Sequence, residues 1–361
     1  MRLLTRWRFG FVLNEDKSTN IHHGEAVTET DTFEADRQAV ELIRAGRDKI
    51  HAELDKVIVG QKDVINQLLI SLFSGGNCLL TGAPGLAKTL LVRSIAEIFD
   101  LQFNRIQFTP DLMPADITGT EILEDNHEGR KLQFVHGPIF ANVILADEIN
   151  RTPPKTQAAL LEAMQEHQVT AAGKRYALPE PFFVLATQNP IEMEGTYPLP
   201  EAQLDRFMFN VHMDYLPIED EIEVVQRTTS LGSEKISKLF TAEDVINFHR
   251  TVRKVPVASE LLRYAVELVD ASRPNRDSTP GFVNEWVNWG AGIRGAQNLV
   301  LGAKARALLE GRSHVNLEDI QSLVLPTLRH RILPGYRAQA ENISVEMIID
   351  RIVESVSRPN V

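Results

Sequence analysis

The sequence predicts an α/β fold, in which a parallel sheet is flanked by helices and carries two hairpin inserts, followed by a C-terminal domain made only of helices. Three observations lead to this prediction. Short apolar runs alternate with helical segments between residues 77 and 213, which is typical of a parallel sheet covered on both faces. Two polar, glycine-containing stretches interrupt this alternation and indicate hairpins. After residue 217 the strand signals cease and helical periodicity takes over.

The apolar runs give the expected strands, and the segments around them give the expected helices. A helical pattern begins near Ala35, a second helix covers Gln61–Phe73, and the hairpins are expected within residues 119–138 and 167–181. We expect a tail over residues 1–34, the α/β domain over 35–215 and the helical domain over 216–361. The expected strands are Cys78–Leu80, Phe103–Phe108, Val143–Ala146, Phe182–Ala186 and Phe207–Met213.

Composition excludes several classes of protein. The 361 residues are 43% hydrophobic and 24% charged, as in an ordinary soluble protein, and no apolar run is long enough to span a membrane. The net charge of −11 disfavours general nucleic-acid binding, because an acidic chain is repelled by phosphate backbones. The single cysteine excludes an internal disulfide, and Met1–Leu13 has too short an apolar part for a secretory signal. We therefore expect a cytoplasmic protein.

A glycine-rich loop between the first strand and the next helix predicts a phosphate-binding site. Backbone N–H groups and the helix N-terminus would face the phosphates, Lys88 would reach the β- and γ-phosphates, and Thr89 would bind Mg²⁺. The general pattern has glycine before the lysine, so Ala87 predicts a negative φ at that position. The alternative is a turn with a surface lysine. The loop consists of Gly82, Ala83, Pro84, Gly85, Leu86, Ala87, Lys88 and Thr89.

Two acidic residues follow the buried strand Val143–Ala146. Such a strand can deliver carboxylates to a phosphoryl-transfer site, with Asp147 holding Mg²⁺ and Glu148 orienting and deprotonating the attacking water. The alternatives are an exposed acidic strand end or a cap for the following helix. Arg151 follows this pair and is expected either to pair with the acids or to cross a subunit interface.

Three further polar residues stand where they can sense or complete such a site. Asn189 follows the strand Phe182–Ala186 and can contact the γ-phosphate or the water, or can satisfy its own turn before a proline. Arg206 can reach a neighbouring subunit's nucleotide or pair locally with an acid. Arg294 begins a helix and can fold back onto the γ-phosphate or remain solvated.

Together, the motifs in Gly82–Thr89, Asn142–Gln165 and Ala186–Phe207 and the helical C-terminal part resemble the MoxR family of AAA+ ATPases, over roughly residues 45–345. Ala87 before the lysine is similar to this family's usual loop. The resemblance implies a P-loop AAA+ sheet with a helical lid, Walker A residues Lys88 and Thr89, and Walker B residues Asp147 and Glu148. It also implies that Asn189 is sensor 1, Arg206 the arginine finger and Arg294 sensor 2. The implied nucleotide-binding residues also include Val59, Gly60 and Leu90.

The same resemblance implies ATP and Mg²⁺ as ligands and a homo-oligomeric ring, usually a hexamer. It implies a chaperone-like role in maturing or activating partner proteins, often ones with von Willebrand factor A domains and sometimes by aiding metal insertion. Before Arg294 the family commonly has Ser-Pro, whereas this chain has Gly292 and Ile293. The alternatives are the ATPase subunit of a metal chelatase, a nucleic-acid motor of the same ATPase class, or a nucleotide-gated scaffold without useful turnover.

Overall fold

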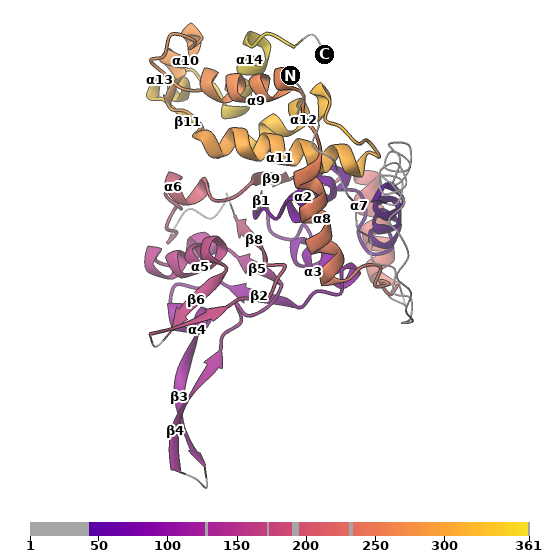
Figure 1. Cartoon of the computed structure of the whole chain (residues 1–361), viewed down its shortest axis with the longest axis vertical. Helices are drawn as coiled ribbons and strands as arrows, with labels where there is room; N and C mark the ends of the chain where they lie inside the picture. The colour runs from indigo at the N-terminus through magenta and orange to yellow at the C-terminus, as the bar shows by residue number, and fades with distance from the viewer. Residues whose placement is uncertain (1–42, 127–128, 172, 190–194, 231–233, 360–361) are drawn as a thin grey trace, which may run out of the picture.

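A computed structural model of the chain describes residues 43–126, 129–171, 173–189, 195–230 and 234–359 (Figure 1). The expected tail over residues 1–34 lies outside the described residues, and the domain boundaries stay predictions. The expected helix near Ala35 is described from residue 43 and runs to residue 54. Among the described helices, none combines the length and the apolar character needed to cross a membrane.

The centre of the molecule is a five-stranded parallel sheet, as the apolar runs predicted. Strands that run parallel bring their carboxyl ends to one edge, so the phosphate loop, the acidic pair and Asn189 all follow strands at the same edge. We call this the phosphate edge; the opposite edge is the one at which the strands begin. In spatial order the strands are β2 (Phe103–Gln107), β5 (Val143–Asp147), β8 (Phe183–Gln188), β1 (Cys78–Gly82) and β9 (Phe209–Met213).

Apolar side chains cover both faces of the sheet. Alternate residues of one strand enter different cores: Val143 and Leu145 belong to one, whereas Ile144 and Ala146 belong to the other. The first core also contains residues of α2 (Lys62–Ser74), α3 (Lys88–Ile98) and the helical C-terminal part; the second contains residues of α5 (Pro154–Glu166). This two-sided burial explains why the inner strands β5 and β8 are continuous apolar runs, whereas the outer strands β2 and β9 contain several polar residues.

The two interruptions of the α/β pattern are antiparallel hairpins, as predicted. They are β3 (Gly119–Asn126) with β4 (Gly129–His136), after the short helix α4 (Pro114–Thr118), and β6 (Gln168–Ala171) with β7 (Lys174–Ala177). The rings of Phe134 and Tyr176 stack with their centroids 4.1 Å apart, which joins the hairpins near their bases. Figure 1 shows β3 and β4 extending away from the sheet.

The C-terminal part is mostly helical, and the side chains of Thr241 and Asn316 form capping boxes at the starts of two of its helices. The prediction that strands cease after residue 217 missed one short antiparallel pair, between β10 (Val287–Trp289) and β11 (Leu333–Pro334). Strands of two or three residues are too short to show a periodicity. The helices are α7 (Ile218–Thr229), α8 (Ala242–Lys254), α9 (Ser259–Ala271), α10 (Gly281–Trp286), α11 (Ile293–Leu309), α12 (Leu317–Leu328), α13 (Tyr336–Ala340) and α14 (Val345–Ser355).

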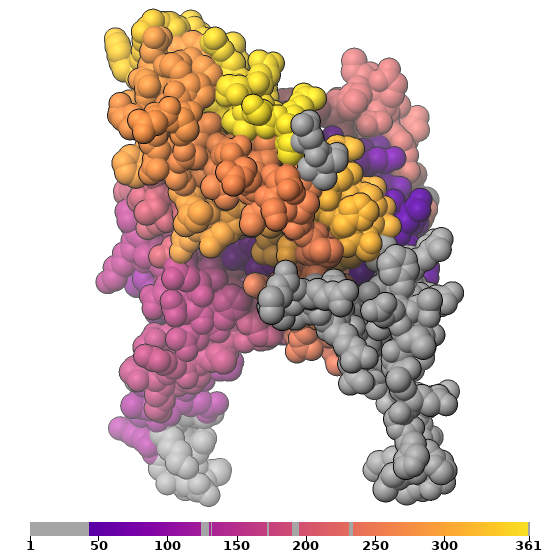
Figure 2. Space-filling view, turned by 45° about the horizontal axis from the view of Figure 1, so that its top comes forward, coloured from indigo at the N-terminus to yellow at the C-terminus, as the bar shows by residue number. Residues whose placement is uncertain are grey.

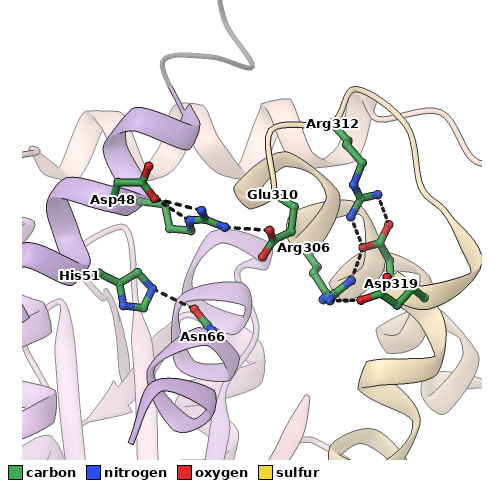
Figure 3. Close-up of polar contacts among 9 residues, drawn as sticks. Asp48, His51, Asn66, Arg306, Glu310, Arg312 and Asp319 are labelled. Atoms are coloured by element: carbon green, nitrogen blue, oxygen red, sulfur yellow. Dashed lines mark hydrogen bonds and ion pairs between the residues drawn. The ribbon is translucent and has the colours of Figure 1, made fainter. Parts of the chain in front are cut away.

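Ion pairs fasten the helical part together and to the rest of the chain. The buried Asp319 carboxylate accepts hydrogen bonds from Arg306 at 2.7 Å and Arg312 at 2.5 Å (Figure 3). Arg47, near the start of the described chain, pairs with Glu310 at 2.9 Å. In Figure 2 the orange and yellow residues of the helical part form one end of the molecule, and the magenta residues of the α/β part lie below them.

Candidate active site

The phosphate loop joins β1 to α3, and its backbone corrects one prediction. We expected a negative φ at Ala87, but its φ is 58° and its ψ is 24°, in the left-handed region. Gly85 also has a positive φ, of 86°. When a residue in the ordinary conformation is next to one in the left-handed conformation, their backbone N–H groups point to the same side of the loop. The loop then forms a concave site for an anion. For an alanine this conformation costs about 1–2 kcal/mol, so the loop holds backbone strain immediately before Lys88.

Lys88 is the first residue of α3, and its side chain lies against its own loop. Its Nζ donates a hydrogen bond to the carbonyl oxygen of Gly82 at 2.5 Å. Burial lowers the pKa of Lys88, and the nearby Asp147 and Glu148 carboxylates partly oppose this shift. Thr89 and Leu90 follow in the first turn, so the loop, the helix N-terminus and an ammonium group come together at one end of β1.

Asp147 is the last residue of β5, and both of its carboxylate oxygens have partners. Oδ1 accepts a hydrogen bond from the hydroxyl of Thr187 on β8 at 2.6 Å. Oδ2 accepts from Nη2 of Arg105 on β2 at 2.6 Å. Neighbouring strands on either side therefore hold this carboxylate in place.

Glu148 leaves the strand in a left-handed conformation, with φ 57°. Its N–H donates to the Thr187 hydroxyl at 2.8 Å, and its Oε2 accepts from Gln107 at 3.0 Å and Arg151 at 2.9 Å. Arg151 therefore pairs with the acids within the chain, which is one of its two predicted alternatives. Gln107 and Arg151 therefore hold this carboxylate in place in the isolated chain.

Asn189 directly follows β8, which lies between β1 and β5, and its side chain is buried. An amide at this position lies between the strand that leads into the phosphate loop and the strand that ends in the acidic pair. Thr187, Arg105 and Gln107 are polar residues of the site that sequence reasoning missed. Their signal was the polar residues at the end of β8 and the several polar residues within β2.

A groove of about 300 Å³ lies beside the phosphate loop. Near it, the side chain of Gln61 donates to the carbonyl of Asp214 at 3.0 Å. Gly60 packs so tightly that an added Cβ would lie 2.8 Å from Asp220 Oδ2. Val59 and Gly60 therefore stand close to one end of the groove. Its lining residues are Thr81, Gly82, Ala83, Leu86, His212, Met213, Asp214 and Tyr215.

The two candidate arginines lie together at the opposite edge of the sheet. They share a groove of about 260 Å³ with Asn77 and Met208, which immediately precede β1 and β9. Arg206 donates to the carbonyl of Leu161 at 2.8 Å rather than pairing with a neighbouring acid. Arg294 lies 3.7 Å from Asp205. Arg294 therefore lies at the edge opposite the phosphate loop of its own chain, and its role at a γ-phosphate stays a prediction.

The docking of the helical part explains where Arg294 lies. Arg331 is buried, and its Nε donates to Asp205 at 2.8 Å, while Nη2 donates to the carbonyl oxygen of Phe207 at 2.6 Å. These bonds hold the segment that follows α12 against the start of β9. Since α11 packs against α12, the start of α11 and Arg294 are held at the same edge.

The donor set near the phosphate loop fits a hard divalent cation that also binds phosphate oxygens. Mg²⁺ is usually held by one or two protein oxygens, with substrate phosphates and water completing its coordination. The Thr89 hydroxyl and the Asp147 carboxylate are such oxygens. Within the described part of the chain, no group of three or more His, Cys, Asp or Glu side chains could hold a metal without a substrate.

Comparisons with known proteins agree with this arrangement. Residues 77–209 match the ATPase family associated with various cellular activities (AAA), and residues 283–352 match the AAA lid domain. The chain is 40% identical to Chaperone MoxR1 of Mycobacterium tuberculosis, over 86% of this chain and 81% of the relative. It is 32% identical to Protein MoxR of Paracoccus denitrificans, over 85% and 95%.

A solved structure extends the agreement to the whole fold. A crystal structure from Cytophaga hutchinsonii superimposes with a TM-score of 0.82 at 44% identity, covering 90% of this chain and 98% of that one. The relatives match well beyond the phosphate loop, and the lid match falls in the helical part that carries Arg294. The chain belongs to the MoxR family of AAA+ ATPases.

Proposed function

We propose that the chain is a Mg²⁺-dependent ATPase that works as a homo-oligomeric ring and couples hydrolysis to the maturation or activation of partner proteins. The observation that carries the proposal is the separation of the polar residues. Lys88, Asp147 and Glu148 lie at the phosphate edge, whereas Arg206 and Arg294 share a groove at the other edge. A complete site therefore needs the arginines of a second copy.

Each residue at the phosphate edge has a role in binding or in positioning water. The loop N–H groups and Lys88 bind the phosphates, and Lys88 exchanges the Gly82 carbonyl for a phosphate oxygen. Thr89 and Asp147 would hold Mg²⁺, and the bound ion would supply positive charge beside the phosphates. Val59, Gly60 and the neighbouring groove receive the base and sugar.

Hydrolysis requires Glu148 to change partners. In the isolated chain its carboxylate accepts bonds from Gln107 and Arg151. Once released from at least one donor, it can orient and deprotonate the attacking water, while the Asn189 amide orients the water or the γ-phosphate. Arg206 and Arg294 of the neighbour then stabilise the charge that develops on the transferred group.

The coupling to partner proteins is proposed from the relatives. A relative that is 40% identical is named as a chaperone, Chaperone MoxR1. We propose a cytoplasmic ring, hexameric as in the family, that acts on protein clients, including ones with von Willebrand factor A domains.

Mixing two inactive variants tests the shared site. We expect Glu148→Gln to bind a fluorescent ATP analogue normally while turnover falls about 10²–10⁴-fold. We expect Arg206→Ala to lose on the order of 10³-fold or more. Mixed, the two should regain activity, since intact Glu148 of one chain meets intact Arg206 of the other.

The control is Arg263→Ala, which removes an arginine whose side chain is 79% exposed in α9. It should leave turnover unchanged. Absence of recovery in mixed assemblies would refute the shared site, and normal turnover by Glu148→Gln would refute the role of that carboxylate.

A further inference from the structure

Helix α7 is amphipathic, but it turns its polar side toward the protein. Asp220 faces Gly60, and Nη1 of Arg227 donates to the carbonyl oxygen of Asp55 at 2.7 Å. Glu223 pairs with Arg227 on the same side. Figure 1 shows α7 at the rim of the molecule, beside the helix of residues 43–54 rather than over the sheet.

The apolar side of α7 faces solvent. Ile218, Ile222 and Val225 are 70%, 52% and 59% exposed. Positions i, i+4 and i+7 share one helix face, so these residues form a continuous stripe, which we call the α7 stripe. Glu219 and Glu221 flank it on the helix surface. Contiguous exposed apolar residues rimmed by charges mark a surface that another molecule covers.

The α7 stripe continues directly from the nucleotide groove. Tyr215, which is 70% exposed, lines that groove beside the phosphate loop, and α7 begins three residues later. Any molecule that brings arginines to a nucleotide at the phosphate edge therefore comes close to the start of this helix.

The opposite edge of the same chain has complementary chemistry. Arg206, Arg253 and Arg294 line its groove, with Asp205 as the acid among the lining residues. Ile293, next to Arg294, is 59% exposed. We call these three arginines and Ile293 the arginine face. It combines positive charge with an apolar side chain, whereas the α7 stripe combines apolar side chains with flanking glutamates.

We propose that the α7 stripe is the docking surface for the arginine face of a second copy of this chain. Apolar contacts with the stripe and charge attraction to Glu219 and Glu221 would seat that copy so that its Arg206 and Arg294 reach the nucleotide. The contact joins different surfaces of the two copies, so its repetition generates a ring or a helical array. The inference rests on the proposed shared site and adds the surface that aligns it.

Substitution of one stripe residue tests the proposal. Ile222→Lys removes apolar contact and opposes the arginine face with like charge. We expect it to need about tenfold or more higher protein concentration to assemble with a non-hydrolysable ATP analogue, measured by sedimentation velocity. ATPase activity should shift with assembly, whereas analogue binding by the single chain should not change.

Met347→Lys is the matched control, because Met347 is also 52% exposed and lies on α14, outside both surfaces. It should assemble like the parent, and thermal unfolding should show that both variants fold. If the parent assembles and Ile222→Lys assembles equally well, the docking proposal is overturned while the shared site survives. If the parent does not assemble, or assembles without gaining activity, the proposed function fails instead.

Cross-linking identifies what covers the stripe. The one natural cysteine, Cys78, is buried, so introduced thiols can be addressed selectively. A mixture of Ile222→Cys chains and Ile293→Cys chains, treated with a short bis-maleimide, should give a covalent dimer containing one of each. Dimers made only of Ile222→Cys chains, or an uncrosslinked mixture under conditions of full assembly, would contradict the pairing.

Discussion

The two edges of the central sheet hold their polar residues in different ways. At the phosphate edge, two residues that are not glycine, Ala87 and Glu148, have φ of 58° and 57°. At the opposite edge, the buried Arg331 holds Asp205, beside Arg294. One edge is thus shaped by strained backbone and the other by a buried ionic network.

This difference matches what each edge has to do. Strained residues lie at sites where surrounding structure holds them, and they let N–H groups and carboxylates face a ligand at close range. A buried ion pair contributes fixed geometry more than stability. In the assembly that we propose, the arginine face meets a site on another chain, and the network between Asp205 and Arg331 would hold that face in place.

Among the substitutions that test this difference between the edges, we expect Arg331→Met to lower the free energy of unfolding most. It leaves Asp205 without its main partner and removes one donor each from the carbonyls of Phe207 and Met208. Breaking a buried pair on one side costs about 3–5 kcal/mol. Urea unfolding should show a loss of this size in the free energy of unfolding.

Arg263→Met is the surface control, since that arginine lies 3.9 Å from Glu267 with its side chain 79% exposed. We expect a loss of no more than about 1 kcal/mol there. Equal losses for the two variants would show that the arginine face does not depend on the buried network.

An acid-dependent loss of stability is expected from His330 in the same network. It lies partly buried beside Arg329 and Arg331, and burial, followed by the charge of Arg331, lowers its pKa well below the ordinary value of 6.5. Nε2 lies 3.2 Å from the carbonyl of Phe207, and Nδ1 has no hydrogen-bond partner among the residues that the structure describes, which fits a neutral ring. The folded state therefore resists protonation that the unfolded state accepts.

This difference in protonation sets the direction in which the free energy of unfolding changes with pH. Above pH 6.5 His330 is neutral in both states, and as the pH falls below 6.5 the unfolded state gains a proton that the folded state does not. The free energy of unfolding should fall by up to about 1.4 kcal/mol per pH unit for this group. Between pH 7 and 5.5, the free energy of unfolding measured with urea should fall less for His330→Gln than for the parent. An unchanged acid dependence would assign the effect to other groups, including His249, whose pKa burial also lowers.

Local sequence pattern was sufficient for the sheet and the phosphate edge. Buried parallel strands are continuous apolar runs, and their carboxyl ends necessarily share an edge, so Lys88, Asp147 and Asn189 could be placed together before any coordinates. The hairpins showed as polar interruptions between regular elements. These features depend on neighbours in sequence or on one general rule of topology.

The rest depends on contacts between distant residues. Arg294 lies where the docking of the helical part puts it, and that docking is fixed by bonds between Arg331 and Asp205, which are far apart in the sequence. Arg105 and Gln107 join the site through the register of β2 against β5. The positive φ of Ala87 was missed because alanine, unlike glycine, gives no signal of a left-handed conformation.

At the phosphate edge, Ala87→Gly is expected to change the free energy of unfolding least. Glycine adopts the left-handed conformation without the cost that alanine bears, but it loses more freedom on folding. The net result should be a gain of roughly 0.5–1 kcal/mol in the free energy of unfolding, with nucleotide binding retained because the N–H groups of the loop are unchanged. Ala52→Gly, at an exposed site in the helix of residues 43–54, should have the opposite sign and lose about 1 kcal/mol. A loss at both positions would mean that position 87 carries no strain, and the contrast between the two edges would then rest on Glu148 alone.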